Sequence, residues 1–446
     1  MFIDFMIEIM KENSTKEAVI WNNKTFTYQD LLNRYAYWFE YLIANTRKGA
    51  VVGVRADYSP DSIGLMLALI AKRDIFVPFS FSNKDIEEKL IIAEVEYYVD
   101  YGKGDERLLQ KTSIQASHAL INKLRKREHP GVIVFSSGST GKPKAALHDF
   151  SHLLNKFKSP RATLRSINFL LYDHWGGINT LLYILSNAGL VGVPQERNAE
   201  EVCKFIQNYK IELLPTTPTF LNLILMSKAY LTYDISSLKV ISYGTEMMPE
   251  TTLKSFSSIF PDITLKQTYG LTELGVMRTK SKSNDSLWLK VGGEDYKTKI
   301  VDNTLFIKAK TSILGYLNAP SPFDSEGWYN TGDRVEAKDG WIRFLGRESD
   351  IINVGGQKVF PVEVESILME ISNIQDVSVF AVPNPIMGSV VGAEVVLVED
   401  EAVSLLKKRI RNYLQSRIDG YKIPVVISIA QRHMVTDRFK KSRKIS

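Results

Sequence analysis

Short apolar runs alternate with amphipathic stretches through the first hundred residues of the chain. The apolar runs at 51–54 and 76–79 have the length and the β-branched or aromatic content of buried strands. The stretches at 31–43 and 62–71 are predicted helices. Because a strand, a helix and a strand in succession form a parallel βαβ unit, this order predicts an α/β fold with a mostly parallel sheet and helices on both faces.

The pattern changes near residue 350. Beyond it come predicted helices at 361–371 and 402–418 and predicted strands at 377–382, 393–398 and 425–429. This mixture is typical of a compact α+β domain. Since 446 residues exceed what one hydrophobic core usually organises, we expect a large N-terminal domain at 1–349 and a small C-terminal domain at 350–446.

Composition and charge are those of an ordinary soluble globular protein, with 44% hydrophobic and 24% charged residues. The formal net charge of +6 gives no case for nucleic acid as the main partner, but it suits an anionic small molecule. A basic run just before residue 132 is expected to form a solvated face. Its residues are Lys123, Arg125, Lys126 and Arg127.

Several classes of protein are excluded. The single cysteine, Cys203, rules out disulfide bonds and lies in a helical apolar pattern, so we expect it in the core. Asp4 and Glu8 among apolar residues indicate an amphipathic N-terminal helix rather than a signal peptide. The longest apolar stretch, 63–71, is far below the roughly 20 residues of a membrane span. No HExxH pair supports a zinc site, and we expect a cytoplasmic enzyme.

The segment at 132–144 reads VIVFSSGSTGKPK and joins a predicted buried strand to a loop rich in hydroxyls and glycines. Such a loop lets backbone N–H groups and hydroxyls close around a phosphate, and the lysines add positive charge. The spacing is neither that of a Walker A loop nor that of a GxSxG nucleophile elbow. A flexible linker is the alternative, although linkers seldom follow a buried strand. The candidate phosphate-binding residues are Ser136, Ser137, Gly138, Ser139, Thr140, Gly141, Lys142 and Lys144.

This segment resembles the phosphate-binding signature of the adenylate-forming enzymes, which include acyl-CoA synthetases, adenylation domains of peptide synthetases and beetle luciferases. Later stretches resemble further motifs of that family, in order along the chain. The resemblance implies a large N-terminal domain of mostly parallel sheets, a small mobile C-terminal domain and a hinge between them. It also implies that ATP and Mg²⁺ are used to activate a carboxylic acid.

A predicted strand ends in the residues LLYDHWGG, at 170–177. In the resembled family an aromatic residue or histidine at this strand end borders the carboxylate substrate and the α-phosphate, and His174 takes that place here. A strand cap with a hydrogen-bonded histidine is the alternative interpretation. Amino-acid-activating members have an acidic residue next, whereas this chain has Trp175, so we expect an acid without a free α-amino group. A shifted register would make Asp173 the anchor instead, and Gly177 completes the expected pocket.

Two further stretches, VISYGTE and YGLTE, resemble the family's adenine and phosphate motifs. In the family, the first of these stretches lies along the adenine and forms one wall of the acyl pocket. Its residues here are Tyr243, Gly244, Thr245 and Glu246. In the second, Tyr269 offers a flat face for the adenine and Gly270 permits close backbone approach. Thr272 can hydrogen-bond a phosphate, and Glu273 can hold Mg²⁺ against the phosphates.

The stretch WYNTGD ends in Asp333, where the family uses a carboxylate to accept hydrogen bonds from both ribose hydroxyls. Arg347 matches the family's basic residue near the ribose and phosphates. Asp350 matches its hinge residue. Gly355 and Gly356 match the glycine loop that the small domain brings to the thiol.

The C-terminal tail resembles the segment that carries the family's catalytic lysine. Thr436, Lys440 and Arg443 match, whereas Met434 and Phe439 stand where the family has proline and glycine. The resemblance therefore assigns the catalytic lysine to Lys440, with Lys441 and Lys444 close by in the chain. A solvated basic tail is the alternative interpretation.

These motifs imply an ATP-dependent ligase that forms an acyl-adenylate with release of pyrophosphate and passes the acyl group to a thiol. The thiol is that of coenzyme A or the phosphopantetheine of a carrier protein acting in trans, and the sequence leaves both open. The small carboxylic acid is not identified. A non-catalytic nucleotide-binding scaffold is the alternative from another class, supported by the altered tail and opposed by Thr272, Glu273, Asp333 and Arg347.

Overall fold

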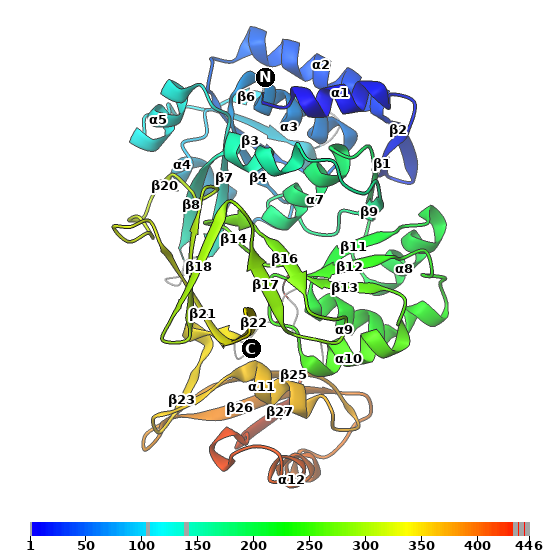
Figure 1. The fold of residues 1–446 in the computed structure, drawn as a ribbon, viewed down its shortest axis with the longest axis vertical. Coiled ribbons are helices and arrows are strands. Elements are labelled where there is room, and N and C mark those ends of the chain that lie inside the picture. The colour runs from blue at the N-terminus through cyan, green and yellow to red at the C-terminus, as the bar shows by residue number, and fades with distance from the viewer. Residues whose placement is uncertain (1, 104–107, 138–141, 431–435, 437–440, 442–446) are drawn as a thin grey trace.

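The protein is described by a computed structural model, which covers residues 2–103, 108–137, 142–430, 436 and 441. A large part holds the elements from α1 to β22. A smaller part, from β23 to β27, lies at one end of the molecule, opposite the N-terminal helices (Figure 1). This two-part α/β fold confirms the predicted fold class. The boundary at residue 350 stays a prediction.

One sheet of the large part carries the strands predicted in the first hundred residues. Within the described residues its order is β20-β8-β7-β4-β3-β5-β6, with β7, β4, β3 and β5 parallel and the outer pairs antiparallel. The register places Ser136 opposite Lys144 across β7 and β8, on either side of the segment predicted to bind phosphate. The elements are β3 (Val51–Arg55), α3 (Pro60–Lys72), β4 (Ile75–Phe79), α4 (Ile86–Ile92), β5 (Tyr97–Asp100), β6 (Gln110–Lys111), α5 (Ala119–Arg127), β7 (Gly131–Ser137), β8 (Pro143–Asp149) and β20 (Gly315–Tyr316).

A second sheet has the order β13-β12-β11-β9-β10-β1-β2 in the part of the chain that the structure describes, and every pair except β1 with β2 is parallel. Its carboxyl ends therefore meet along one edge. The elements are α1 (Asp4–Glu12), β1 (Glu17–Trp21), β2 (Lys24–Thr27), α2 (Tyr28–Asn45), α6 (Phe150–Leu154), β9 (Arg165–Ile167), α7 (Trp175–Leu185), β10 (Leu190–Val193), α8 (Ala199–Tyr209), β11 (Leu213–Thr216), α9 (Pro218–Ser227), β12 (Val240–Tyr243), α10 (Glu250–Ile259) and β13 (Thr264–Gln267).

An antiparallel sheet, which the sequence pattern did not predict, follows with the order β16-β17-β22-β21-β19-β18. It carries Asp333 and Arg347 on paired positions of β21 and β22. Its strands are β16 (Arg278–Ser281), β17 (Leu289–Gly292), β18 (Tyr296–Val301), β19 (Thr304–Ala309), β21 (Tyr329–Lys338) and β22 (Trp341–Arg347). Just before it, β14 (Gly270–Leu271) and β15 (Gly275–Val276) pair with each other in a separate two-stranded sheet.

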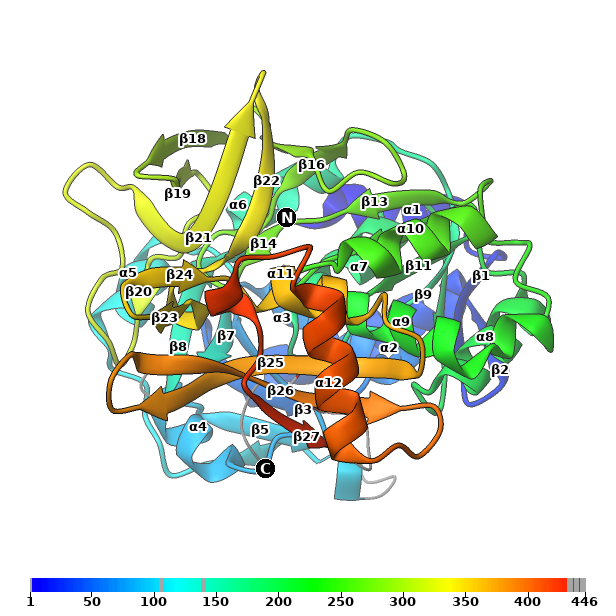
Figure 2. The ribbon, with the colours of Figure 1, turned by 90° about the horizontal axis from the view of Figure 1, so that it is seen from below.

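The smaller part is a sheet covered by two helices, and α12 lies across β25, β26 and β27 when the molecule is seen from below (Figure 2). The predicted helices and strands beyond residue 360 are confirmed, with the ends shifted by a few residues. The expected glycine loop is the turn of a hairpin between β23 and β24. The elements are β23 (Ile352–Val354), β24 (Gln357–Val359), α11 (Pro361–Leu368), β25 (Ile374–Asn384), β26 (Gly388–Leu397), α12 (Val403–Leu414) and β27 (Val426–Ile429).

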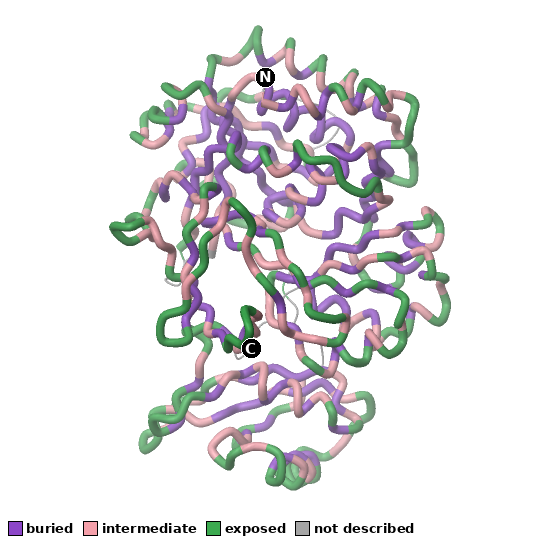
Figure 3. The backbone as a smooth tube through the Cα atoms, viewed as in Figure 1, coloured by how far each residue is buried: buried purple, intermediate pink, exposed green. Residues whose placement is uncertain are grey.

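The hydrophobic core explains this layering. One buried cluster joins Val52 of β3 and Val191 of β10 to residues of α3 and α7, so these helices lie between the two large sheets. Purple, buried backbone accordingly runs through the sheets, and exposed backbone lies on the outer loops and helices (Figure 3). Cys203 is buried in α8, as predicted. Burial of this apolar surface is the main stabilising term in folding.

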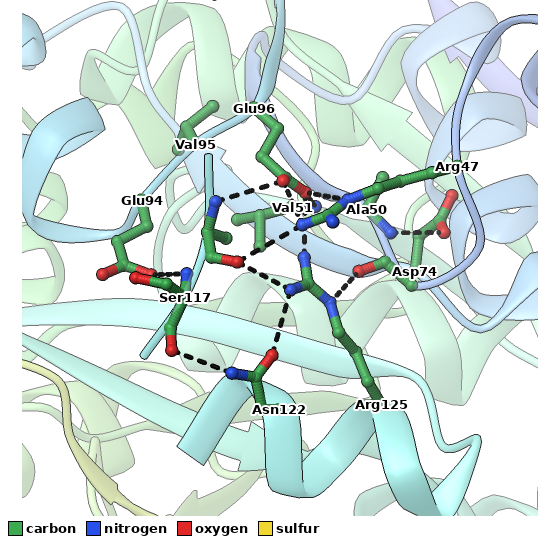
Figure 4. Close-up of polar contacts among 12 residues, drawn as sticks. Arg47, Ala50, Val51, Asp74, Glu94, Val95, Glu96, Ser117, Asn122 and Arg125 are labelled. Carbon is green, nitrogen blue, oxygen red and sulfur yellow. Dashed lines mark hydrogen bonds and ion pairs between the residues drawn. The ribbon is translucent and has the colours of Figure 1, made fainter. Parts of the chain in front are cut away.

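A buried polar cluster ties α5 to the edge of the first sheet (Figure 4). The Glu96 carboxylate is 5% exposed and accepts hydrogen bonds from the Val51 N–H at 3.1 Å, from Arg125 at 2.9 Å and from Arg47. Arg125 also donates to the carbonyl oxygen of Gly49 at 2.8 Å. The prediction of a solvated basic face is therefore wrong for Arg125, because its position in the helix turns it toward Glu96.

Replacement of Glu96 by glutamine should lower the free energy of unfolding by about 1–3 kcal/mol. The substitution removes a charged acceptor from the two arginines and from the backbone N–H groups of Val51 and Ala116. Glu128→Gln is the matched control. That carboxylate also pairs with two basic residues, Lys48 and Arg73, but it is exposed, so its loss should lower the free energy of unfolding much less than the loss of Glu96 does. Denaturant unfolding of both variants measures the difference, and equal midpoints would refute this account of the cluster.

Candidate functional site

A cavity of about 380 Å³ opens where the second sheet meets β7 and β8. Strand β11 ends there in Thr216, and β12 leads there into Gly244. Helix α7 begins at the same edge, beside Asp173 and His174. In open parallel sheets, ligands bind outside the carboxyl ends of the strands, so the topology itself indicates a binding site here.

A second cavity of about 250 Å³ adjoins the first and shares Thr245, Tyr269 and Arg347 with it. It extends toward the antiparallel sheet and the smaller part of the molecule. Motifs that lie far apart in the sequence are thus brought together around two continuous hollows. The predicted site residues that line one or both are Ser136, Lys144, Asp173, His174, Trp175, Gly244, Thr245, Glu246, Tyr269, Gly270, Thr272, Glu273, Asp333, Arg347 and Asp350.

Other predicted residues lie elsewhere. Gly138, Ser139, Thr140, Gly141 and Lys440 fall outside the described residues. Ser137 is the last residue of β7. Lys142, Gly177, Tyr243, Gly355 and Gly356 do not line either cavity. A Cβ atom on Gly177 would lie 2.2 Å from the Tyr58 hydroxyl, so this glycine packs behind the wall. The Tyr243 ring is 1% exposed and belongs to the core below β12, which corrects its expected place in the pocket.

The carboxylate of Asp333 lies between Tyr269 and Arg347. The Tyr269 hydroxyl donates to Asp333 Oδ2 at 2.5 Å, and Arg347 Nε donates to Oδ1 at 3.2 Å. Burial raises the pKa of Asp333, while the arginine beside it favours the ionised form. The Tyr269 ring stacks on Phe344 with centroids 4.6 Å apart. Because Phe344 covers one face of the tyrosine ring, the other face is left for a flat ligand.

Glu273 is 7% exposed, and its Oε1 accepts a hydrogen bond from the Tyr316 hydroxyl at 2.5 Å. Lys144 Nζ lies 5.5 Å from the centre of the same tyrosine ring. The described residues contain no cluster of three or more metal-ligating side chains. One carboxylate facing a cavity beside hydroxyls and a lysine nevertheless fits Mg²⁺, which usually takes one or two carboxylates and completes its shell with phosphates and water.

His148 belongs to none of the predicted motifs, but it contacts the backbone of Thr272, which lines the cavity. Its Nε2 lies 2.7 Å from the carbonyl oxygen of Thr272, and Trp175 Nε1 lies 3.3 Å from the same oxygen. Burial lowers the pKa of His148 to about 4, so the ring is neutral and its Nε2–H donates to the carbonyl. Two N–H groups thus hold the carbonyl of Thr272, the residue just before Glu273. The sequence offered only its place four residues beyond Lys144, which does not indicate this contact.

His174 caps α7. Its Nδ1 accepts a hydrogen bond from the Gly176 N–H at 3.0 Å, so in the neutral ring the proton sits on Nε2. The interpretation as a cap is confirmed. His174 also lines the cavity, and its role beside the carboxylate stays a prediction. Asp173 is 6% exposed and lines the cavity too, with Oδ2 accepting from Asn83 Nδ2 at 2.7 Å.

Glu246 has a different setting from the one expected along the adenine. Its Oε1 accepts from the Thr219 N–H at 2.8 Å, at the start of α9, and its Oε2 accepts from the Lys441 N–H at 3.0 Å. The Lys441 ammonium in turn bonds the Val377 carbonyl at 2.6 Å and Asp376 at 3.0 Å. Glu246 therefore connects the large part with the tail, and Lys441 is engaged by the smaller part.

The two-part fold and the motifs gathered at its cavities are those of the adenylate-forming enzymes. The sequence profile of the AMP-binding enzyme matches residues 8–304, and the profile of the AMP-binding enzyme C-terminal domain matches residues 363–440. The chain therefore belongs to the AMP-binding enzyme family. No helix in the described residues has both the length and the apolar character needed to cross a membrane.

Curated relatives are distant. The long-chain-fatty-acid–CoA ligase FadD13 of Mycobacterium tuberculosis is 26% identical over 67% of this chain, and the match spans 63% of that ligase. The 2-succinylbenzoate–CoA ligase of Enterococcus faecalis is 24% identical over 77% of this chain and 75% of its own length. The luciferin 4-monooxygenase of Luciola mingrelica is 24% identical over 94% and 78%.

Solved structures share the fold at lower identity. The anthranilate CoA ligase AuaEII in complex with anthranoyl-AMP superimposes with a TM-score of 0.81, covering 98% of this chain and 95% of that one at 18% identity. A four-domain nonribosomal peptide synthetase, AB3403, bound to AMP and glycine superimposes with a TM-score of 0.83 over 99% of this chain and 36% of that one at 18% identity. These likenesses establish the fold and leave the substrate open.

Proposed function

We propose that this protein activates a small carboxylic acid as its acyl-adenylate at the expense of ATP and then transfers the acyl group to the thiol of coenzyme A. The observation that carries the proposal is the pair of adjoining cavities. One is lined by Asp333, Tyr269 and Arg347, and the other by Lys144, Thr272 and Glu273. The first set of residues suits the ribose and adenine of ATP, and the second set suits its phosphates and the carboxylate of the acid.

The proposed reaction has two balanced steps. A carboxylate oxygen attacks the α-phosphorus of ATP, the bond to the β-phosphate oxygen breaks, and pyrophosphate leaves. The thiol sulfur then attacks the acyl carbon, the bond from that carbon to the AMP oxygen breaks, AMP leaves, and the thiol proton passes to solvent. Little covalent chemistry falls to the protein, so rate enhancement should come from positioning and charge stabilisation.

In this scheme Asp333 accepts hydrogen bonds from the ribose hydroxyls, and Tyr269 contacts the adenine with its open face. Lys144 and the hydroxyl loop neutralise phosphate charge. Glu273, oriented by Tyr316, would hold Mg²⁺, and the ion would neutralise phosphate oxygens when bound. In this scheme His174, which lines the cavity, borders the carboxylate.

We propose that residues 350–446 act as a mobile unit hinged near Asp350. The Gly355 and Gly356 hairpin turn would approach the thiol in a second closure. Support comes from the position of Asp350, which lies between β22 and β23 where the two parts of the molecule join. In the present arrangement the Gly355 N–H donates to the Met387 carbonyl oxygen at 2.9 Å. This hairpin therefore contacts the turn between β25 and β26 of the smaller part.

One observation each supports a different acyl acceptor and a different class of acid. The acyl acceptor could be the phosphopantetheine of a carrier protein acting in trans, since a peptide synthetase shares the fold. Amino acids also belong among the candidate substrates, because Asp173 lines the cavity. The alternative of a non-catalytic nucleotide-binding scaffold is less well supported, because Thr272 and Glu273 are both present and line the cavity.

Exchange of labelled pyrophosphate into ATP tests the proposal. We expect exchange that depends on both the acid and Mg²⁺ in a panel of aliphatic, aryl and amino acids. Release of AMP with coenzyme A, but not with a phosphopantetheinyl carrier, would favour the proposed acceptor. ATP binding without exchange for any acid would support the scaffold and contradict the enzyme.

A further inference from the structure

The acyl end of the larger cavity is lined by polar groups with unused hydrogen-bonding capacity. Asn179 lies on the second turn of α7, and Thr216 is the last residue of β11. The Oδ1 atom of Asn179 and the Oγ1 atom of Thr216 are both buried, and neither has a hydrogen-bond partner among the described residues. Buried polar atoms in native proteins normally have hydrogen-bond partners. A hydrogen-bond donor on a ligand could supply the missing partner of both oxygens.

The neighbouring side chains reinforce this character. Asp173, a carboxylate that only accepts hydrogen bonds when ionised, lines the same cavity, as does Ser242 of β12. Leu170, Pro215 and Val276 supply its apolar surface. The wall therefore offers more hydrogen-bond acceptors than an alkyl chain could use.

We infer, on the basis of the proposed function, that the acid carries a hydrogen-bond donor, a hydroxyl or an amine, that bonds Asn179 and Thr216. An apolar chain in this place would leave both oxygens unsatisfied after excluding water. A site built to bond a hydroxyl or amine rejects the analogue that lacks it, by roughly 10⁴-fold in favourable cases. Long-chain fatty acids are accordingly excluded as good substrates.

Pyrophosphate exchange with isosteric acids tests the inference. The pairs are 4-hydroxybutanoate with pentanoate and 4-hydroxybenzoate with 4-methylbenzoate, with 4-aminobutanoate and 4-aminobenzoate as amine arms and octanoate and hexadecanoate as apolar arms. We expect the best donor-bearing acid to exceed its methyl isostere in kcat/KM by roughly 100-fold or more. Asp173→Asn should weaken an amine more than a hydroxyl, which tells the two donors apart.

Variants locate the effect. Thr216→Val and Asn179→Leu should each reduce the ratio of donor-bearing to methyl-bearing acid by roughly 10-fold, whereas Thr216→Ser should retain it. Thr252→Val is the matched control, because that buried hydroxyl also lacks a partner among the described residues but lies in α10, outside this cavity. Its ratio should stay unchanged.

Equal or better exchange with the methyl isosteres or with octanoate and hexadecanoate would overturn the inference and leave the proposed function standing. A ratio that is insensitive to both Thr216→Val and Asn179→Leu would also overturn it. Absence of exchange with every acid would instead contradict the proposed function, and the inference with it.

Discussion

Replacement of Lys440 by alanine is expected to slow acyl-adenylate formation by roughly 10²–10³-fold, the usual effect of removing one charge-stabilising donor from a transition state. The same variant should still convert supplied acyl-adenylate and thiol to thioester at close to the normal rate. The family resemblance assigns Lys440 to the first step only, because the second closure would carry the tail away from the nucleotide. Pyrophosphate exchange and single-turnover thioester formation, measured on one preparation, separate the two steps.

The neighbouring lysine provides the control. Lys441 is 11% exposed at its side chain and pairs with Asp376, so its ammonium is engaged by the smaller part of the molecule. Lys441→Met should therefore affect adenylation less than Lys440→Ala does. Normal adenylation by Lys440→Ala combined with a large loss in Lys441→Met would show that the motif is aligned one residue out of register.

The second large effect concerns the nucleotide. Asp333→Ala should weaken ATP binding by about 2–4 kcal/mol, which is roughly 30- to 1,000-fold in Kd, because two ribose hydroxyls lose an ionised acceptor. The substitution also leaves the Tyr269 hydroxyl and Arg347 Nε without their shared partner. Isothermal titration of the folded variant with ATP measures the change.

Asp339→Ala is a suitable control, since Asp339 is exposed at the turn between β21 and β22, the two strands that carry Asp333 and Arg347. It should bind ATP as the unmodified protein does. If Asp333→Ala binds ATP with unchanged affinity, the ribose does not lie at Asp333 and the nucleotide would have to be placed elsewhere.

Local sequence predicted the elements well where burial is continuous. The runs that became β3, β4, α2 and α3 are apolar over enough residues for their period to be unambiguous. The antiparallel sheet escaped prediction because its strands lack a strong alternation of buried and exposed positions. In β18, for example, two of the six residues are intermediate and the other four are exposed. Pairing partners far apart in the sequence then decide the topology.

The candidate site was predictable to the extent that single motifs carry its chemistry. Asp333, Tyr269 and Glu273 line cavities as their motifs implied. Tyr316 and His148 could not be found in this way, because neither belongs to one of the motifs. Tyr316 contacts Glu273 from 43 positions away, and His148 contacts the Thr272 carbonyl from 124 positions away. The contact of Glu246 with the tail was not predicted for the same reason, because its partner Lys441 lies 195 positions away in the chain.

Glycine illustrates a further limit. The motif gave Gly355 and Gly356 the same role, yet a Cβ atom on Gly355 would lie 2.4 Å from the Met387 Cε, whereas one on Gly356 would meet nothing within 4 Å. Both have positive φ, of 56° and 89°. Only the tertiary contact tells the two apart, so substitutions at Gly355 would perturb the hairpin itself as well as any second closure.

The central claim, that a carboxylate oxygen attacks the α-phosphorus of ATP, is tested most directly by oxygen tracing. The protein is supplied with an accepted acid labelled with ¹⁸O in both carboxylate oxygens, together with ATP, Mg²⁺ and coenzyme A, and the nucleotide product is analysed by mass spectrometry. The account predicts AMP that carries one ¹⁸O per molecule and unlabelled pyrophosphate. Unlabelled AMP, or ADP accompanied by labelled inorganic phosphate, would contradict it.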